Sequence, residues 1–145
     1  VPLVRWSRAQ AVTRWLAEAG RTRDAEKMRA LRREIAERHL RTYSEVDVWL
    51  TPAVAIPPPE VGAFARLPPA EAFRGAAQLG AFTAAFNITG QPAASVPLGL
   101  TRDGLPMGLQ IAGRELADDV VLAVSRQIEE AAPWRARRAP LFDAA

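Results

Sequence analysis

The sequence contains no cysteine, only one histidine and only one lysine. Without cysteine the chain can form neither disulfide bonds nor thiolate metal sites, which fits a cytoplasmic protein. One histidine and scattered carboxylates make no recognisable metal-binding pattern, so we expect no metal. No apolar run reaches the ~20 residues that a membrane-spanning helix needs, so we expect no membrane contact. The first residue, Val1, is not methionine, and no signal peptide follows it. We therefore expect the chain to begin inside a longer protein.

Positive charge is carried almost entirely by arginine. Lysine and arginine together number 19, of which Lys27 is the only lysine, and the net charge is +3. The arginines alternate with acidic residues along the expected helices and form no single basic block. This pattern predicts a solvated helix surface and no nucleic-acid partner.

The chain also lacks a recognisable catalytic serine. Its serines are Ser7, Ser44, Ser95 and Ser125, and none lies in a Gly-x-Ser-x-Gly elbow. A serine nucleophile needs a neighbouring base and oxyanion donors. We interpret Ser95 as a packed small residue of a strand. We interpret His39 as a packing or surface residue of a helix, and we predict no catalytic residue in the chain.

With 145 residues, 49% hydrophobic and 24% charged, the chain has the length and composition of one soluble α/β domain. Four helices are expected from apolar periodicity and end signals. The first begins at a Ser7–Gln10 capping box and ends at Gly20, and the second, capped by Thr22, runs to about Thr42. Its inward residues are expected to be Met28, Leu31, Ile35, and His39 or Leu40. The third covers Glu71–Ala85, and the fourth covers Asp119–Ala132 behind an Asp118 cap, with Val121, Val124, Ile128 and Ala132 inward.

A β-hairpin is expected between Ala93–Leu100 and Met107–Ala112. Asp103-Gly104 suits the positive φ angles of a tight turn. Pro97 predicts an edge or bulged position, because proline donates no ladder hydrogen bond. A further, buried strand is expected at 46–51, ended by Pro52. An extended proline-rich connection at 53–69 and a loop at 87–92 complete the chain.

Three short motifs lie close together in the hairpin region. They read Asn87…Gly90-Gln91-Pro92, Ser95-Val96-Pro97-Leu98-Gly99 and Asp103-Gly104-Leu105-Pro106-Met107-Gly108-Leu109-Gln110. This stretch strongly resembles the C-terminal end of the amidase signature family. The resemblance implies an α/β fold in which residues 1–145 form the C-terminal part of an amidase signature domain, with a mixed β-sheet flanked by α-helices.

The resemblance also implies an activity, the hydrolysis of a carboxylic amide through an acyl-serine. Amidase signature enzymes use a Ser–cis-Ser–Lys triad in a Gly/Ser-rich segment upstream of the part seen here. This chain has no Gly-Gly-Ser-Ser-like run, and Lys27 lies on an expected helix surface. No catalytic residue is therefore carried over, no cofactor is implied, and the chain is expected to be inactive alone. Its expected partners are a small-molecule amide and the remainder of its own protein, or a second copy.

Substrate-binding candidates come from the segment that borders the acyl-binding cavity in relatives: Gly80, Phe82, Thr83, Phe86 and Asn87. Plain core packing is the alternative for the two phenylalanines. Amidotransferase A-type subunits, an alternative within the family, tend to hold the glutamine amino group with an acidic residue near position 80. Glycine there favours a less polar substrate. The rival outside the family is a non-catalytic helical interaction module.

Overall fold

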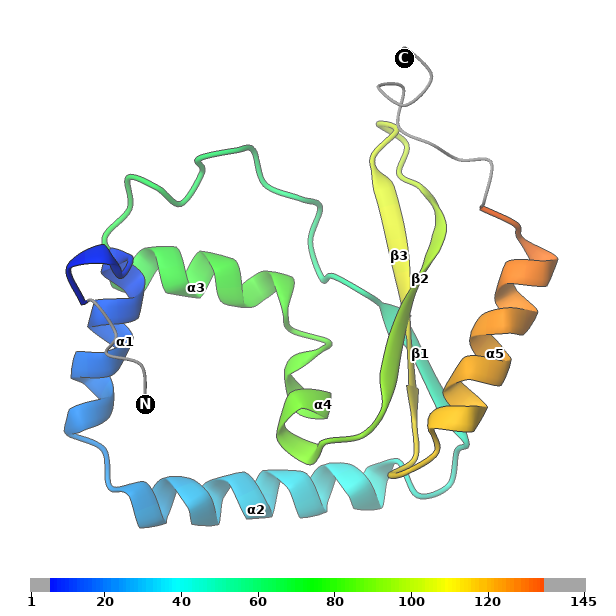
Figure 1. Cartoon of the computed structure of the whole chain (residues 1–145), viewed down its shortest axis with the longest axis horizontal. Helices are drawn as coiled ribbons and strands as arrows, with labels where there is room; N and C mark the ends of the chain where they lie inside the picture. Colours follow the sequence, from blue (N-terminus) through cyan, green and yellow to red (C-terminus); the bar gives the residue numbers. More distant parts are fainter. Residues whose placement is uncertain (1–5, 135–145) are drawn as a thin grey trace.

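The computed structural model describes residues 6–134, and within them three antiparallel strands form one sheet (Figure 1). The strands are β1 (Val48–Pro52), β2 (Ala93–Leu100) and β3 (Pro106–Gly113), in the order β1-β3-β2. β3 is central because both other strands pair with it. Helices accompany the sheet, so the predicted α/β class is confirmed.

The predicted hairpin of β2 and β3 is confirmed, and its turn differs from the expected one. Leu100 pairs with Pro106, so five residues form the loop. The Gly104 amide donates to the Thr101 carbonyl at 3.0 Å, and the Thr101 amide donates to the Leu105 carbonyl at 2.7 Å. Gly104 has a φ of 80°, whereas Asp103 has no positive φ. The register shifts between Pro97 and Gly99 on an edge strand, as the proline predicted.

The strand expected at 46–51 exists, and it is an edge strand rather than a buried one. It starts at Val48 and includes Pro52, and three of its five residues are half-buried while Leu50 and Pro52 are exposed. Proline is tolerated there because the strand has only one hydrogen-bonded neighbour. Arg114 secures the chain before it, with Nε 2.9 Å from the Val46 carbonyl and Nη2 3.2 Å from Asp47.

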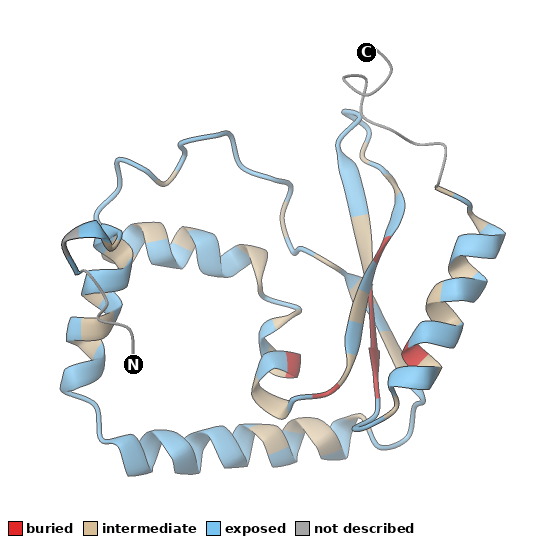
Figure 2. Cartoon of the chain, in the orientation of Figure 1, coloured by how far each residue is buried: buried red, intermediate tan, exposed pale blue. Residues whose placement is uncertain are grey.

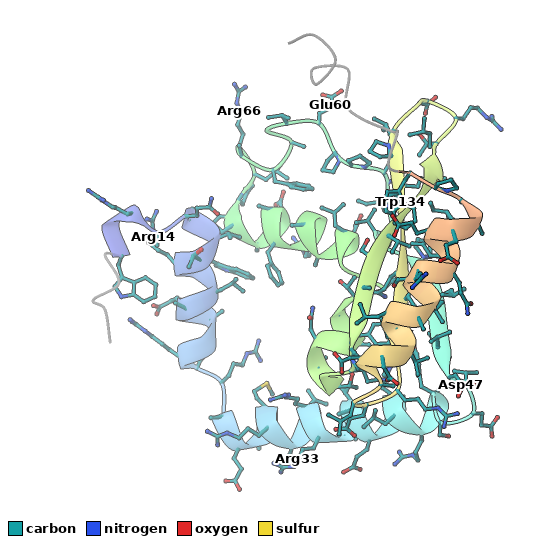
Figure 3. All side chains as sticks on the ribbon, turned by 45° about the vertical axis from the view of Figure 1, so that its right-hand side comes forward. Arg14, Arg33, Asp47, Glu60, Arg66 and Trp134 are labelled. Carbon is teal, nitrogen blue, oxygen red and sulfur yellow. The ribbon has the colours of Figure 1, made fainter. Side chains whose placement is uncertain are left out.

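One face of the sheet packs against α5 (Asp118–Ala131). Val96, Ile111 and Val121 form the buried core there. Val124 and Ile128 are partly buried against it, and so is Trp134, beside the end of α5 (Figure 3). The expected inward residues Val121, Val124 and Ile128 are thus confirmed. The expected Asp118 cap is wrong, because Ala117 precedes the helix and Asp118 is its first residue.

The other face meets α4 (Ala84–Thr89) and the end of α2 (Ala25–Thr42). The predicted end of α2 at Thr42 is confirmed, but Thr22 does not cap its start. Asp24 does, accepting from the amides of Glu26 at 2.9 Å and Lys27 at 3.2 Å. A carboxylate is favoured in this position by the positive end of the helix.

The first and third expected helices have different boundaries from those predicted. Trp6–Arg8 form a short 3-10 helix (η1), α1 covers Ala11–Arg21, and no side chain caps its start, so the capping box is wrong. Gly20 lies inside α1. The third helix is divided into α3 (Pro69–Leu79) and α4, because the chain turns at 80–83. The loop expected at 87–92 begins only at Gly90, whose φ of 80° ends α4.

Helices α1, α2 and α3 spread away from the sheet (Figure 1), and most of their surface is exposed (Figure 2). The expected inward position of Met28, Leu31 and Ile35 is wrong, since these side chains are 44%, 46% and 39% exposed. His39 and Leu40, nearer the sheet, are half-buried. None of the described helices is both long and apolar enough to cross a membrane.

Candidate functional site

A hollow of about 540 Å³ lies between α4 and the sheet face opposite α5. Ser95 and Gln110 are paired across β2 and β3, and both side chains line it. They alternate with Val96 and Ile111, which face α5, because successive side chains of a strand point to opposite faces. Small residues such as Ala93 and Ala53 leave the space open.

Gln110 is a firmly held polar group of the hollow. Its side chain is buried, and its Nε2 donates to Thr51 Oγ1 at 3.0 Å and to the Phe82 carbonyl at 3.2 Å. These bonds join the central strand to β1 and to the turn between α3 and α4. The Phe82 carbonyl can only accept, which fixes the orientation of the Gln110 amide.

The turn between α3 and α4 holds three of the five predicted binding residues, Gly80, Phe82 and Thr83. Thr83 Oγ1 donates to the Gly80 carbonyl at 3.2 Å. A Cβ added at Gly80 would meet Thr83 Oγ1 at 3.4 Å, an ordinary contact. Within the described residues, position 80 therefore has room for a side chain, and lack of space does not require glycine there. The turn brings Thr83 to the lining of the hollow.

A second buried glutamine fixes the start of β2. Gln91 Nε2 donates to the Gly113 carbonyl at 2.8 Å, and its Oε1 accepts from Thr89 Oγ1 at 3.1 Å. The Gly113 amide in turn donates to the Pro92 carbonyl at 2.9 Å. These bonds join the end of α4 to the last residue of β3. The helix that forms the wall of the hollow is thus fixed to the sheet that forms its floor.

An aromatic cluster supports the wall from behind. It consists of His39 and Tyr43 at the end of α2, Trp49 of β1 and Phe86 of α4. Phe86 is 5% exposed and touches His39 and Tyr43 edge-on, at 5.2 Å and 5.6 Å between ring centroids. Burial lowers the pKa of His39 and raises the pKa of Tyr43. His39 thus has the packing role predicted for it.

The structure brings three of the five predicted binding residues to the hollow: Thr83, Phe86 and Asn87 line it. Gly80 and Phe82 lie in the adjoining turn, where Phe82 contributes its carbonyl to Gln110. Phe86 is both a core residue and a wall residue.

Three polar lining residues, Gln91, Ser95 and Gln110, were not predicted. Ser95 is exposed and faces the hollow, so its interpretation as a packed residue is wrong. The alternation of Gln110 with Leu109 and Ile111 is a signal that could have identified it. A polar residue at the inward position of a central strand needs partners.

The described residues that line the hollow include no ionisable side chain. They offer hydroxyl, amide and apolar groups, a set suited to a neutral ligand with a few hydrogen-bonding atoms. No cluster of three or more histidine, aspartate or glutamate side chains able to hold a metal occurs between residues 6 and 134. The arrangement can therefore bind and orient a neutral molecule.

Comparison with known proteins gives this hollow a context. The family model described as Amidase matches residues 4–122. A Mycobacterium tuberculosis protein named as an amidase, AmiB2, is 37% identical over 134 residues, 90% of this chain and 29% of that protein. The solved structure of 6-aminohexanoate cyclic dimer hydrolase superposes with a TM-score of 0.82 at 29% identity, covering 94% of this chain and 31% of the other.

A more distant structural neighbour is the A-type subunit of the glutamyl-tRNA(Gln) amidotransferase from Thermotoga maritima. It has a TM-score of 0.65 and 30% identity, over 84% of this chain and 25% of the other. The chain thus spans less than a third of the length of the relatives it matches. The family match covers most of the chain, and the structural likeness includes its spread helices. The chain belongs to the amidase signature family.

Proposed function

We propose that the chain forms part of the substrate-pocket wall of an amidase that hydrolyses a carboxylic amide to an acid and ammonia or an amine. The acyl-serine chemistry belongs to a Ser–cis-Ser–Lys triad in a preceding Gly/Ser-rich segment of the protein. Residues 1–145 then correspond to the C-terminal part of the amidase signature domain. Lack of cysteine supports a cytoplasmic location for the enzyme.

The hollow beside α4 is the observation that carries the proposal. It lies within the residues that match the family, and it contains Thr83, Phe86 and Asn87 together with Ser95 and Gln110. Its walls are neutral, and the side chains of Thr83, Gln91 and Gln110 are held by hydrogen bonds before any ligand binds. Such prearranged polar groups in a mainly apolar hollow are typical of small-molecule sites.

A glutamine-hydrolysing amidotransferase component is the alternative within the family, supported by the Thermotoga maritima structure. Free glutamine carries an ammonium and a carboxylate, and both need charged partners when they leave water. The described lining residues provide none, and position 80 is glycine. A neutral amide is therefore favoured over glutamine.

The first test is activity. The purified 145-residue chain should release no ammonia from a panel of aliphatic and aromatic amides, because within residues 6–134 no serine hydroxyl is hydrogen-bonded to a basic side chain. The chain joined to its preceding coding sequence should be active, and replacing the expected nucleophilic serine there with alanine should abolish turnover. Turnover by the short chain that disappears in Ser95→Ala would overturn the assignment of catalysis to a preceding segment.

The second test separates the amidase from the helical interaction module. The preceding coding sequence should encode a Gly/Ser-rich segment with a lysine upstream of it. A start codon close to Val1, with no such segment, would instead favour the module.

A further inference from the structure

The carbonyl oxygen of the Gln110 side chain is an unused acceptor in the hollow, and it belongs to a buried residue, whereas Ser95 and Asn87 are exposed. Both Nε2 hydrogen bonds of Gln110 go to residues that do not line the hollow, to Thr51 Oγ1 and to the Phe82 carbonyl. No hydrogen bond to its Oε1 is formed by the described residues. The oxygen is also not among the fully enclosed unpaired atoms, which in the described part of the chain are His39 Nε2 and Trp49 Nε1. Gln110 Oε1 therefore remains accessible in a residue that is 5% exposed.

The acceptor is also rigid. Rotation of the amide by 180° would direct Oε1 at the Phe82 carbonyl, and two carbonyl oxygens repel each other. The Gln110 backbone is fixed as well, because β3 pairs with Thr51 on one side and Ser95 on the other. An acceptor held in this way loses little conformational entropy when a ligand donates to it.

We propose that Gln110 Oε1 accepts a hydrogen bond from an amide N–H of the substrate and so selects neutral primary and secondary amides over tertiary ones. This inference rests on the proposed function. The neutral lining disfavours a charged ammonium as the donor, and a tertiary amide has no N–H to offer. Gln110 is then a specificity-determining residue, reached through the hollow that Ser95 and Asn87 share.

The selectivity follows from the free-energy cost of binding a ligand that leaves Gln110 Oε1 without a hydrogen-bond donor. A tertiary amide would displace water from Gln110 Oε1 without replacing its hydrogen bond. One neutral hydrogen bond corresponds to a preference of about five- to ten-fold in Kd. The preference should depend on the Gln110 oxygen and not on the size of the hollow.

The experiment measures binding of two probes, N-methylhexanamide and N,N-dimethylhexanamide, to the full 145-residue chain by ligand-observed NMR. The wild-type chain should bind the secondary amide about five- to ten-fold more tightly. Gln110→Met, similar in length and without an acceptor, should bring the ratio close to one. Ser125→Ala is the matched control and should keep the wild-type ratio, because Ser125 lies on α5 and donates to the Val121 carbonyl.

A second measurement does not depend on the folding of the variant. In the wild-type chain labelled with ¹³C at glutamine side-chain carbonyls, the secondary amide should shift the Gln110 resonance, and the tertiary amide should not. Equal Kd values for both probes, or a ratio unchanged in folded Gln110→Met, would overturn the inference while leaving the amide site in place. Failure of both probes to bind would contradict the proposed function itself, and the inference with it.

Discussion

The ring of Tyr43 stacks on the indole of Trp49 with their centroids 3.6 Å apart and their planes 26° from parallel. Tyr43 follows the last residue of α2, and Trp49 lies in β1 on the face that carries the hollow. Tyr43 also touches His39 at 3.8 Å and the edge of Phe86 at 5.6 Å. The ring thus joins the long helix, the edge strand and the short helix that forms the wall of the hollow.

Removal of this ring should destabilise the fold. Tyr43→Ala should lower the free energy of unfolding by about 2–3 kcal/mol, because a half-buried ring leaves a gap that its three neighbours cannot close. Tyr43→Phe keeps the ring and should stay within about 0.5 kcal/mol of the wild type. Urea unfolding followed by tryptophan fluorescence measures both changes. Equal effects of the two substitutions would show that the hydroxyl and not the stacking is important.

His39 should make stability depend on pH. Its Nε2 is enclosed without a partner in the described structure, and burial lowers its pKa below 6.5. Between that lowered value and 6.5 the unfolded chain binds more protons than the folded one. Stability therefore falls as the pH drops through this window and is level above it. The test compares urea unfolding of the wild type and His39→Phe between about pH 5 and 8. An equally steep profile in the variant would exclude His39 as the cause.

Two glycines should respond to alanine in opposite directions. Gly104 has a φ of 80° and no atom near its missing Cβ, so Gly104→Ala strains only the backbone. It should cost about 1–2 kcal/mol. Gly20 lies inside α1, also with open space, and Gly20→Ala should stabilise by up to about 1 kcal/mol. Thermal unfolding of both variants checks the pair. A neutral Gly104→Ala would show that the loop adopts another turn in solution.

Sequence patterns were sufficient to predict the hairpin, the edge position of Pro97 and the end of α2, since each of these features depends on residues close in the sequence. They failed where distant parts of the chain decide the outcome. Apolar spacing identified Met28, Leu31 and Ile35 as one face of α2, but it could not show that nothing in the described part of the chain covers that face. Helix starts were misplaced for a related reason, because Thr22 and Asp24 are both good caps and only the structure shows which one is used.

The residues that α4 and the turn before it contribute to the candidate site were predicted, and the residues that the sheet contributes were not. Thr83, Phe86 and Asn87 were taken from family resemblance, and the structure brings them to one hollow. Ser95 and Gln110 complete it from the hairpin that follows α4. Their shared direction follows from strand register. That register pairs Ser95 with Gln110 only because of the irregularity between Pro97 and Gly99, whose position the sequence did not specify.

An excess of exposed surface leads to the last prediction. The 15.8 kDa chain exposes 11549 Å², whereas a compact monomer of this mass exposes about 7,300 Å². Sixteen residues lie outside the described range. Allowing about 2,500 Å² for them, the fully extended value, still leaves an excess of about 1,500 Å² or more. A stable interface needs about 800 Å² from each partner. The chain alone should therefore self-associate, or require the rest of its own protein to stay dispersed.

The apolar groove beside β1 is the place to test this. Leu50, Leu98 and Met107 line a cavity of about 460 Å³ there and are 53%, 46% and 40% exposed. Sedimentation velocity over a concentration series should show association for the wild type and weaker association for Leu50→Gln with Met107→Gln. Val61→Gln is the matched control, because Val61 is fully exposed and lies outside the groove. A monomeric wild type at high concentration would mean that the chain tolerates its open faces, and the helical interaction module would then be favoured over part of an amidase.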